Sequence, residues 1–127
     1  MLTLICGLPR AGKTTYSKRY EGTCKVVHLD DYGGGDKGHA QCTGAVTSDD
    51  IVVEGIYHTA RWRKNLIQKY SGDWKKCIWL DTPIEVKKKR HGYCAKCEYH
   101  FEPPTYDEGW DEIIVIRGDD NEQRSYR

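Results

Sequence analysis

The sequence has no apolar run near the roughly 20 residues that a membrane-spanning helix needs. It also lacks a charged leader with a cleavage motif, because the first residues enter an apolar segment directly. Repeats, linkers and low-complexity segments are missing too. Net charge is close to zero, since 20 basic and 19 acidic residues give a formal charge of +1; overall charge therefore indicates no partner. We expect a soluble cytoplasmic protein without membrane partners, with one domain over residues 1–127.

A glycine-rich stretch near the N-terminus organises the chain. Residues 7–14 match Gly-x-x-x-x-Gly-Lys-[Ser/Thr], the loop that cradles phosphates in nucleoside triphosphate enzymes. An apolar, strand-like run (2–6) precedes it and a helix-like segment (14–20) follows, so the loop would direct backbone N–H groups at phosphate oxygens. The alternative is a chance glycine-rich turn. The predicted nucleotide-binding residues are Gly7, Pro9, Arg10, Ala11, Gly12, Lys13, Thr14 and Thr15.

These residues predict ATP and Mg²⁺ as cofactors. Lys13 would neutralise the β- and γ-phosphates, which makes it a catalytic candidate, and the Thr14 hydroxyl would ligate Mg²⁺. Glu54 follows the β-branched run 51–53 and would hold the same ion, directly or through water. A structural acid at the end of a sheet is the alternative for Glu54.

Short apolar strands alternate with helices along the rest of the chain. This pattern predicts an α/β fold of the P-loop NTPase and kinase type, with a five-stranded parallel sheet and helices on both faces. A lid is expected at about 84–103, and the tail from Gly118 should be loose or lightly docked. Strands are expected at 2–6, 25–29, 51–53, 77–80 and 112–116, and helices at 14–20, 39–46, 59–70 and 83–90.

Two acids follow the second predicted strand. Asp30 lies nearer the strand end and could accept the proton of an attacking hydroxyl, as a general base does in phosphoryl transfer. Asp31 could contact the substrate or cap the following turn. Both acids could instead be turn formers before Gly33.

Two basic clusters offer further contacts. On the predicted lid, the run 87–90 would stabilise charge on the transferring phosphoryl group, with Lys88 and Arg90 as catalytic candidates. Arg61, Trp62 and Arg63 would contact phosphates and bases of a nucleic-acid strand. Each cluster could instead be an ordinary solvated helix face.

Together these features resemble P-loop kinases of the polynucleotide 5′-hydroxyl kinase type. The resemblance covers nearly the whole chain and includes residues 7–14, 30–32, the Glu54 strand end with Arg61, and the narrower motif Phe-Glu-Pro-Pro-Thr-Tyr-Asp-Glu-Gly-Trp at 101–110. It implies Asp30 as the general base and a lid cation among residues 87–90. The chain departs from the family at Arg10, where glycine is common, at Leu29, where arginine is common, and at Glu54, where aspartate is common.

The resemblance implies transfer of the γ-phosphoryl group of ATP to a hydroxyl of DNA or RNA, with a polynucleotide 5′-hydroxyl as the first choice. Small phage-type kinases with this core also act on hydroxymethylated pyrimidine bases in DNA, a form of DNA modification, and the location would then be the host cytoplasm. A small nucleoside or nucleotide kinase is a further alternative. A nucleotide-binding switch without an acceptor would leave Asp30 and the basic lid unexplained.

Six cysteines are present, but a protein that uses ATP belongs in a reducing compartment, so free thiols or a metal site are expected rather than disulfides. The spacing His-x₂-Cys-x₂-Cys-x₂-His makes His91, Cys94, Cys97 and His100 possible Zn²⁺ ligands. His39 and Cys42 could supply a second half-site. Plain thiols and redox chemistry remain as alternatives.

Overall fold

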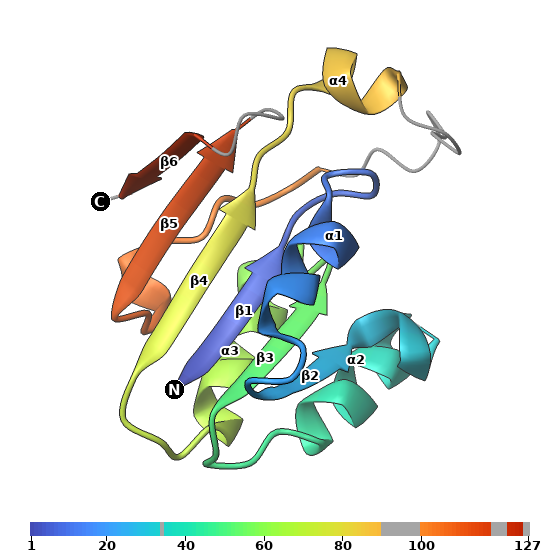
Figure 1. Cartoon of the computed structure of the whole chain (residues 1–127). Helices are drawn as coiled ribbons and strands as arrows, with labels where there is room; N and C mark the ends of the chain where they lie inside the picture. Colours follow the sequence, from blue (N-terminus) through green and yellow to red (C-terminus); the bar gives the residue numbers. More distant parts are fainter. Residues whose placement is uncertain (34, 90–99, 118–121, 126–127) are drawn as a thin grey trace.

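The computed structural model describes residues 1–33, 35–89 and 100–117, together with the backbone of 122–125. Six strands form one sheet in the order β2-β3-β1-β4-β5-β6 (Figure 1). Strands β1 to β5 are parallel, as predicted, and β6 is antiparallel to β5. The strands are β1 (Leu2–Cys6), β2 (Lys25–His28), β3 (Ile51–Gly55), β4 (Lys75–Leu80), β5 (Glu112–Arg117) and β6 (Glu122–Ser125).

The centre of the sheet is its most apolar part. Every residue of β1 and β3 is buried, as expected for parallel strands covered on both faces. β1 pairs with β3 and with β4, so that Leu4 lies between Val53 and Cys77. This register places the ends of β1, β3 and β4 at one edge of the sheet, where the sequence motifs fall.

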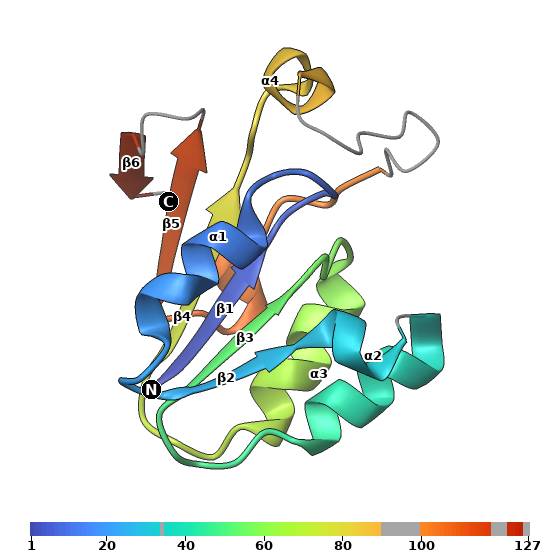
Figure 2. The same cartoon turned by 45° about the vertical axis from the view of Figure 1, so that its right-hand side comes forward.

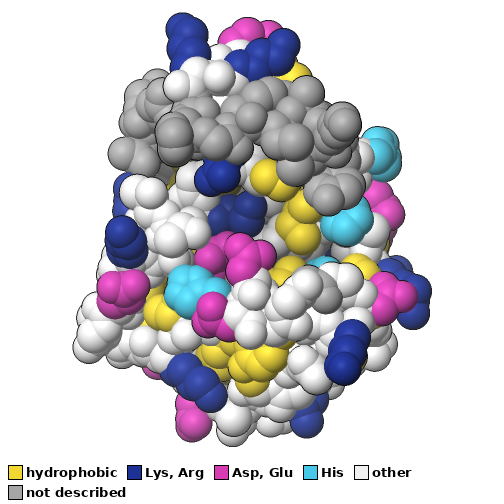
Figure 3. All heavy atoms as spheres, turned by 90° about the vertical axis from the view of Figure 1, so that its right-hand side faces the viewer, with side chains coloured by type: hydrophobic (Ala, Val, Ile, Leu, Met, Phe, Trp, Pro, Cys, Tyr) yellow, Lys and Arg dark blue, Asp and Glu magenta, His cyan; other side chains and the backbone are white. Residues whose placement is uncertain are grey.

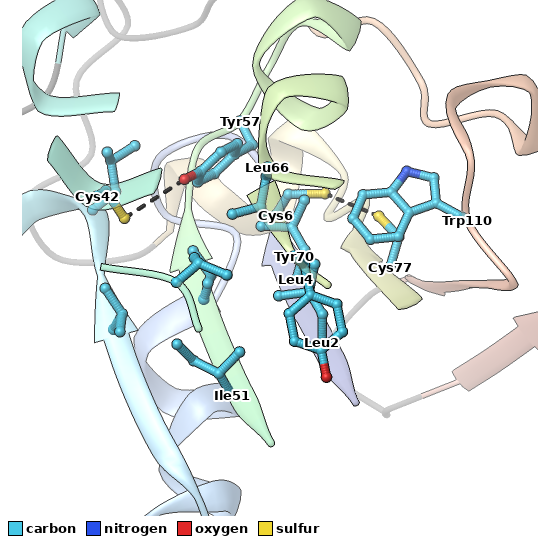
Figure 4. Packing of buried hydrophobic residues seen from close by; sticks show 14 of the residues in the cluster. Leu2, Leu4, Cys6, Cys42, Ile51, Tyr57, Leu66, Tyr70, Cys77 and Trp110 are labelled. Atoms are coloured by element: carbon cyan, nitrogen blue, oxygen red, sulfur yellow. Dashed lines mark hydrogen bonds between the residues drawn. The ribbon is translucent and has the colours of Figure 1, made fainter. Parts of the chain in front are cut away.

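Helices cover both faces of the sheet, as predicted (Figures 1 and 2). Alternate side chains of each strand point to opposite faces, so two apolar clusters form. The larger one lies under α2 and α3 (Figure 4), and the smaller one lies under α1. The helices are α1 (Lys13–Ser17), α2 (Gly35–Gly44), α3 (Ala60–Lys69) and α4 (Ile84–Lys88), with 3₁₀ turns η1 (Lys18–Tyr20), η2 (Leu29–Tyr32) and η4 (Tyr106–Glu108).

Two differences from the sequence prediction go beyond a shift of a few residues at an element's end. The second helix begins at Gly35 rather than at residue 39 and so includes one more turn. The tail, expected to be loose or lightly docked, adds a strand: Ile114 of β5 faces Ser125 of β6. Polar strands such as β6 pair through their backbones, and hydrophobic periodicity does not reveal them. No helix in the described parts of the chain is long and apolar enough to cross a membrane.

A buried ion pair joins α3 to the segment around η4. Arg63 is fully buried, and its Nε and Nη2 donate to the two carboxylate oxygens of Glu108 over 2.7 and 2.9 Å. Its Nη1 donates to the carbonyl oxygen of Tyr57 over 2.7 Å. Glu108 also accepts a hydrogen bond from Nε1 of Trp110 over 3.0 Å. The carboxylate and the guanidinium are therefore both well satisfied, as a buried pair requires.

Candidate active site

The phosphate loop connects β1 to α1 in a conformation that its glycines permit. A Cβ at Gly7 would lie 2.7 Å from the carbonyl oxygen of Leu80, so a side chain there would collide with the backbone of β4. Gly12, directly before α1, has a φ of 102°, which favours glycine. Arg10 has a φ of 69°, which is uncommon for a residue with a side chain. A glycine would fit the backbone at position 10 better.

Lys13 reaches back over the loop. Its Nζ donates to the carbonyl oxygen of Leu8 over 3.0 Å. Burial lowers the pKa of Lys13, while the carboxylates of Glu54 and Asp30 act in the opposite direction and Lys87 lowers it further. Glu54, Asp30 and Lys87 therefore all lie close enough to Lys13 to act on its charge.

A cleft of about 1200 Å³ opens above this edge of the sheet. Figure 3 shows acidic, basic and histidine side chains gathered around a hollow in this face. We divide the lining into a donor half, made by residues 9–16 with Arg19, Leu80, Thr82 and Ile116, and an acceptor half. The acceptor half consists of Leu29, Asp30, Gly33, Gly35, Asp36, His39, Glu54, Ile56, His58 and Trp62.

The predicted nucleotide-binding residues meet in the donor half. Residues 9–15 line the cleft, and Gly7 lies beneath them in the close approach to β4. The Thr14 residue is exposed at the start of α1, where its hydroxyl is open to a ligand. A hydrogen bond from the segment after β4 holds the loop in place: Oγ1 of the buried Thr82 donates to the carbonyl oxygen of Ala11 over 2.8 Å.

Glu54, the last but one residue of β3, lines the cleft with only 4% of its surface exposed. Its Oε1 lies 2.8 Å from Nδ1 of His28, the residue that faces it across the β2–β3 pair. Carboxylate oxygens are donors that Mg²⁺ prefers. Glu54 and Thr14 therefore fit the predicted magnesium ligands by position and chemistry, with His28 as an orienting partner that the sequence reasoning missed.

The two acids after β2, Asp30 and Asp31, differ in their position relative to the cleft. Both lie in η2 and are exposed, but Asp30 lines the cleft whereas Asp31 is not part of its lining. Asp30 also acts on the charge of Lys13, so it lies near the phosphate site. The geometry favours Asp30 over Asp31 as the group that meets an acceptor hydroxyl.

The basic run 87–90 of the predicted lid places Lys87, rather than the catalytic candidate Lys88, beside the phosphate loop. Lys87 is 3% exposed, lines a small cavity with Leu8 and Thr82, and lowers the pKa of Lys13. Lys88 is exposed and does not line the cleft. Arg90 lies outside the described residues. Within the predicted run, the α4 side chain that approaches the phosphate loop is therefore Lys87.

The residues predicted to contact nucleic acid do not all lie at the cleft. Trp62 lines the acceptor half, and Arg61 is exposed with its guanidinium carbon 5.0 Å from the centre of the Trp62 ring. The prediction for Arg63 is wrong, because its guanidinium is buried in the ion pair with Glu108 and does not face the cleft.

The predicted zinc ligands His91, Cys94 and Cys97 lie outside the described residues, and of that set the structure describes the exposed His100. In the alternative half-site, burial raises the pKa of the Cys42 thiol, which accepts a hydrogen bond from the Tyr57 hydroxyl over 3.6 Å. Within the described ranges, no three His, Cys, Asp or Glu side chains are grouped as a metal site would require. Cys6, Cys24, Cys42 and Cys77 are free thiols. The zinc prediction remains a prediction.

Sequence reasoning missed several lining residues. His28 could have been found by pairing β2 with β3, since the register places it opposite Glu54. His39 carried a signal only as a possible zinc ligand, and Asp36 and His58 carried none, because they come together only when α2 packs against the start of α3.

The fold resembles those of several solved structures, including the two that follow. An unliganded sugar kinase from Janibacter sp. HTCC2649 superposes with a TM-score of 0.64 at 18% identity, over 91% of this chain and 84% of that one. Kti12 from Chaetomium thermophilum, in complex with ADP-AlF3, superposes with a TM-score of 0.61 at 15% identity, over 96% of this chain and 92% of that one. No protein-family model and no curated protein sequence matches the chain. These likenesses show a P-loop kinase fold.

Proposed function

We propose that the chain is an ATP-dependent kinase that transfers the γ-phosphoryl group to a hydroxyl. The observation that carries the proposal is the single cleft that holds the phosphate loop in one half and the Asp30 carboxylate in the other. A hydroxyl placed beside Asp30 would share the cleft with the phosphates of a nucleotide bound at the loop, as phosphoryl transfer requires. The similar structure that holds ADP-AlF3 supports nucleotide as the donor.

The roles of the residues follow from their places. Lys13 would neutralise the β- and γ-phosphates, after exchanging its bond to the Leu8 carbonyl for phosphate oxygens. Lys87 would add positive charge from the lid side. As the acceptor oxygen bonds to the γ-phosphorus, Asp30 would take the hydroxyl proton and the bond from the γ-phosphorus to the bridging oxygen would break, releasing ADP. Mg²⁺, held by Thr14 and Glu54, would offset phosphate charge.

Two classes of acceptor are candidates. A polynucleotide 5′-hydroxyl follows from the resemblance of the sequence, and the exposed Arg61 beside Trp62 supports it. A small hydroxyl compound is the second candidate, because Arg63 does not reach the cleft and one similar structure is a sugar kinase. A nucleotide-binding switch explains neither the position of Asp30 nor that of Lys87.

Incubation with γ-labelled ATP and Mg²⁺ tests the proposal. The acceptors are 5′-hydroxyl DNA, 5′-hydroxyl RNA, DNA with hydroxymethylated bases, nucleosides and monosaccharides. We expect label on an alcohol acceptor, and we expect Lys13→Ala to weaken ATP binding and transfer together. Lys69→Ala, which changes an exposed lysine at the far end of α3, is the matched control and should leave both unchanged. Label released only as inorganic phosphate would contradict the kinase proposal.

A further inference from the structure

His39 is a buried imidazole in the wall of the acceptor half. It belongs to α2, is 3% exposed and lines the cleft. Its ring lies flat on Trp62, with ring centres 4.5 Å apart and planes 8° apart, and it meets Tyr57 edge-on at 4.8 Å. Aromatic contacts on two sides hold the imidazole in one orientation. The phosphate-transfer roles assigned above do not use this residue.

Among the described residues, Nδ1 of His39 and Oγ1 of Thr59 are buried without a hydrogen-bond partner. His39 lines the cleft, and Thr59 precedes α3, the helix that carries Trp62. Buried polar groups are nearly always paired in native proteins, with protein or with water. An unpartnered nitrogen in the wall of a cleft indicates a position where a polar ligand, with its water, belongs.

The charge of the acceptor half disfavours phosphate there. Its described lining contains the carboxylates of Asp30, Asp36 and Glu54 and no lysine or arginine. Burial, together with the neighbouring His58, lowers the pKa of His39 to about 4, so its imidazole is neutral near pH 7. An anionic group beside Asp30 and Asp36 would be repelled by their carboxylates, whereas hydroxyl groups can donate hydrogen bonds to them.

Simple packing explains the stack but not the polar atoms. A histidine kept only to fill space against Trp62 gains nothing from a buried nitrogen without a partner. A phenylalanine would fill nearly the same volume. The unpartnered His39 nitrogen, in a cleft wall that also carries Trp62 and is surrounded by carboxylates, is instead suited to a ligand that carries hydrogen-bonding groups.

We propose that the acceptor half binds an uncharged ring compound that bears hydroxyl groups, such as a nucleoside or a monosaccharide. His39 is its specificity-determining residue and hydrogen-bonds the ring compound, Trp62 holds the His39 ring and lines the same wall, and the reacting hydroxyl faces Asp30. The assignment rests on the proposed kinase activity, since it names the acceptor of that reaction.

Labelled ATP, the full chain and three acceptor classes test the assignment: nucleosides, monosaccharides and a 5′-hydroxyl oligodeoxynucleotide. The variant His39→Phe keeps a flat ring on Trp62 and removes both nitrogens. Trp62→Leu removes the packing surface, and Trp74→Leu is its matched control, because Trp74 is 46% exposed and precedes β4 at the opposite edge of the sheet. Thermal unfolding of each variant identifies any that fails to fold.

We expect label on a nucleoside or a monosaccharide, and the class that is labelled identifies the source of the ring. His39→Phe and Trp62→Leu should each raise the acceptor KM at least tenfold while the KM for ATP changes less than threefold. A role in folding alone would affect both KM values or neither. Label on the oligonucleotide alone, or an acceptor KM unchanged in His39→Phe, would overturn the assignment and leave the kinase proposal standing. No label on any class would contradict the kinase proposal itself.

Discussion

Thr82 links the lid to the phosphate loop through one hydrogen bond. Its hydroxyl is buried and donates to the carbonyl oxygen of Ala11 over 2.8 Å, so the start of the lid segment and the loop are held together. The residue lies two positions after the end of β4, ahead of Pro83 and α4. A movement of α4 that brings Lys87 toward the nucleotide would therefore also displace the phosphate loop.

Replacing Thr82 by valine keeps the shape of the side chain and removes this bond. We expect the variant to lose about 1–3 kcal/mol of unfolding free energy, because the Ala11 carbonyl oxygen loses its partner in a buried place. The KM for ATP should rise as the loop loosens. Thr23→Val is the matched control: Thr23 makes a similar bond, to Tyr20, but on the surface, and should change stability by less than about 0.5 kcal/mol. Equal effects of the two variants, in urea unfolding and in KM, would contradict this view of Thr82.

The buried His39 predicts a dependence of stability on pH. Its pKa is about 4 in the folded chain and about 6.5 when unfolded, so the unfolded state binds more protons between these values. Stability should therefore be fully present above pH 6.5 and fall as the pH drops toward 4. Burial and His58 lower the pKa, and Asp36 partly opposes them.

The predicted loss is on the order of 3 kcal/mol for His39, reached as the pH falls below 4. Urea unfolding at pH 7 and at pH 4.5 measures most of it. The wild type should lose about 2 kcal/mol more than His39→Phe over this range, because every other titrating group is common to both proteins. The same loss in both proteins would show that His39 titrates normally in the folded state.

Helix α3 presents a basic face to solvent and a mixed face to the core. Its buried residues are Arg63 and Leu66, and Tyr70 follows on the same face. Arg63 passes through this face to Glu108, which is itself held by the capping box that Thr105 and Glu108 form around η4. The segment 101–110, the narrower part of the family resemblance, is thus a structural clamp on α3, and it also places Phe101 flat against Trp79.

Removing one partner of this ion pair should be costly. We expect Arg63→Met to reduce the unfolding free energy by about 3–5 kcal/mol, because the Glu108 carboxylate would remain buried without its counter-charge. Arg61→Met, two positions away and exposed, is the matched control and should change it by less than about 0.5 kcal/mol. Denaturant titration of both variants measures the two changes in unfolding free energy. A small change for Arg63→Met would mean that water replaces the guanidinium beside Glu108 and would contradict this prediction.

The orientation of α3 about its own axis also explains why the predicted role of Arg63 was wrong. Arg61 and Arg63 are both basic and lie two positions apart, yet Arg61 is exposed and Arg63 is fully buried. Spacing from Leu66 and Tyr70 places Arg63 on the apolar face, and this signal was present in the sequence. Whether a buried arginine finds a carboxylate depends on the distant segment 101–110, which helical periodicity alone does not reveal.

Across the whole molecule, the sequence was most informative where local patterns decide the structure. The buried runs of β1 and β3 and the phosphate loop predicted the parallel sheet and its active edge. It was least informative where packing decides: the His28–Glu54 pair depends on strand register, the His39–Trp62 stack on α2 meeting α3, and β6 on backbone pairing. Local motifs thus identified the loop residues that line one half of the cleft and missed many that line the other half.

The central claim is that Asp30 and the phosphate loop form one phosphotransfer site. Its most direct test is the single-turnover rate of γ-phosphoryl transfer to the best acceptor, measured at saturating ATP in Asp30→Asn. Asp73→Asn, which changes an exposed acid before β4 at the opposite edge of the sheet, is the matched control. We predict a fall of about 100-fold or more for Asp30→Asn, with ATP affinity within threefold of wild type and no change in the control. Transfer at the wild-type rate in Asp30→Asn would contradict the account.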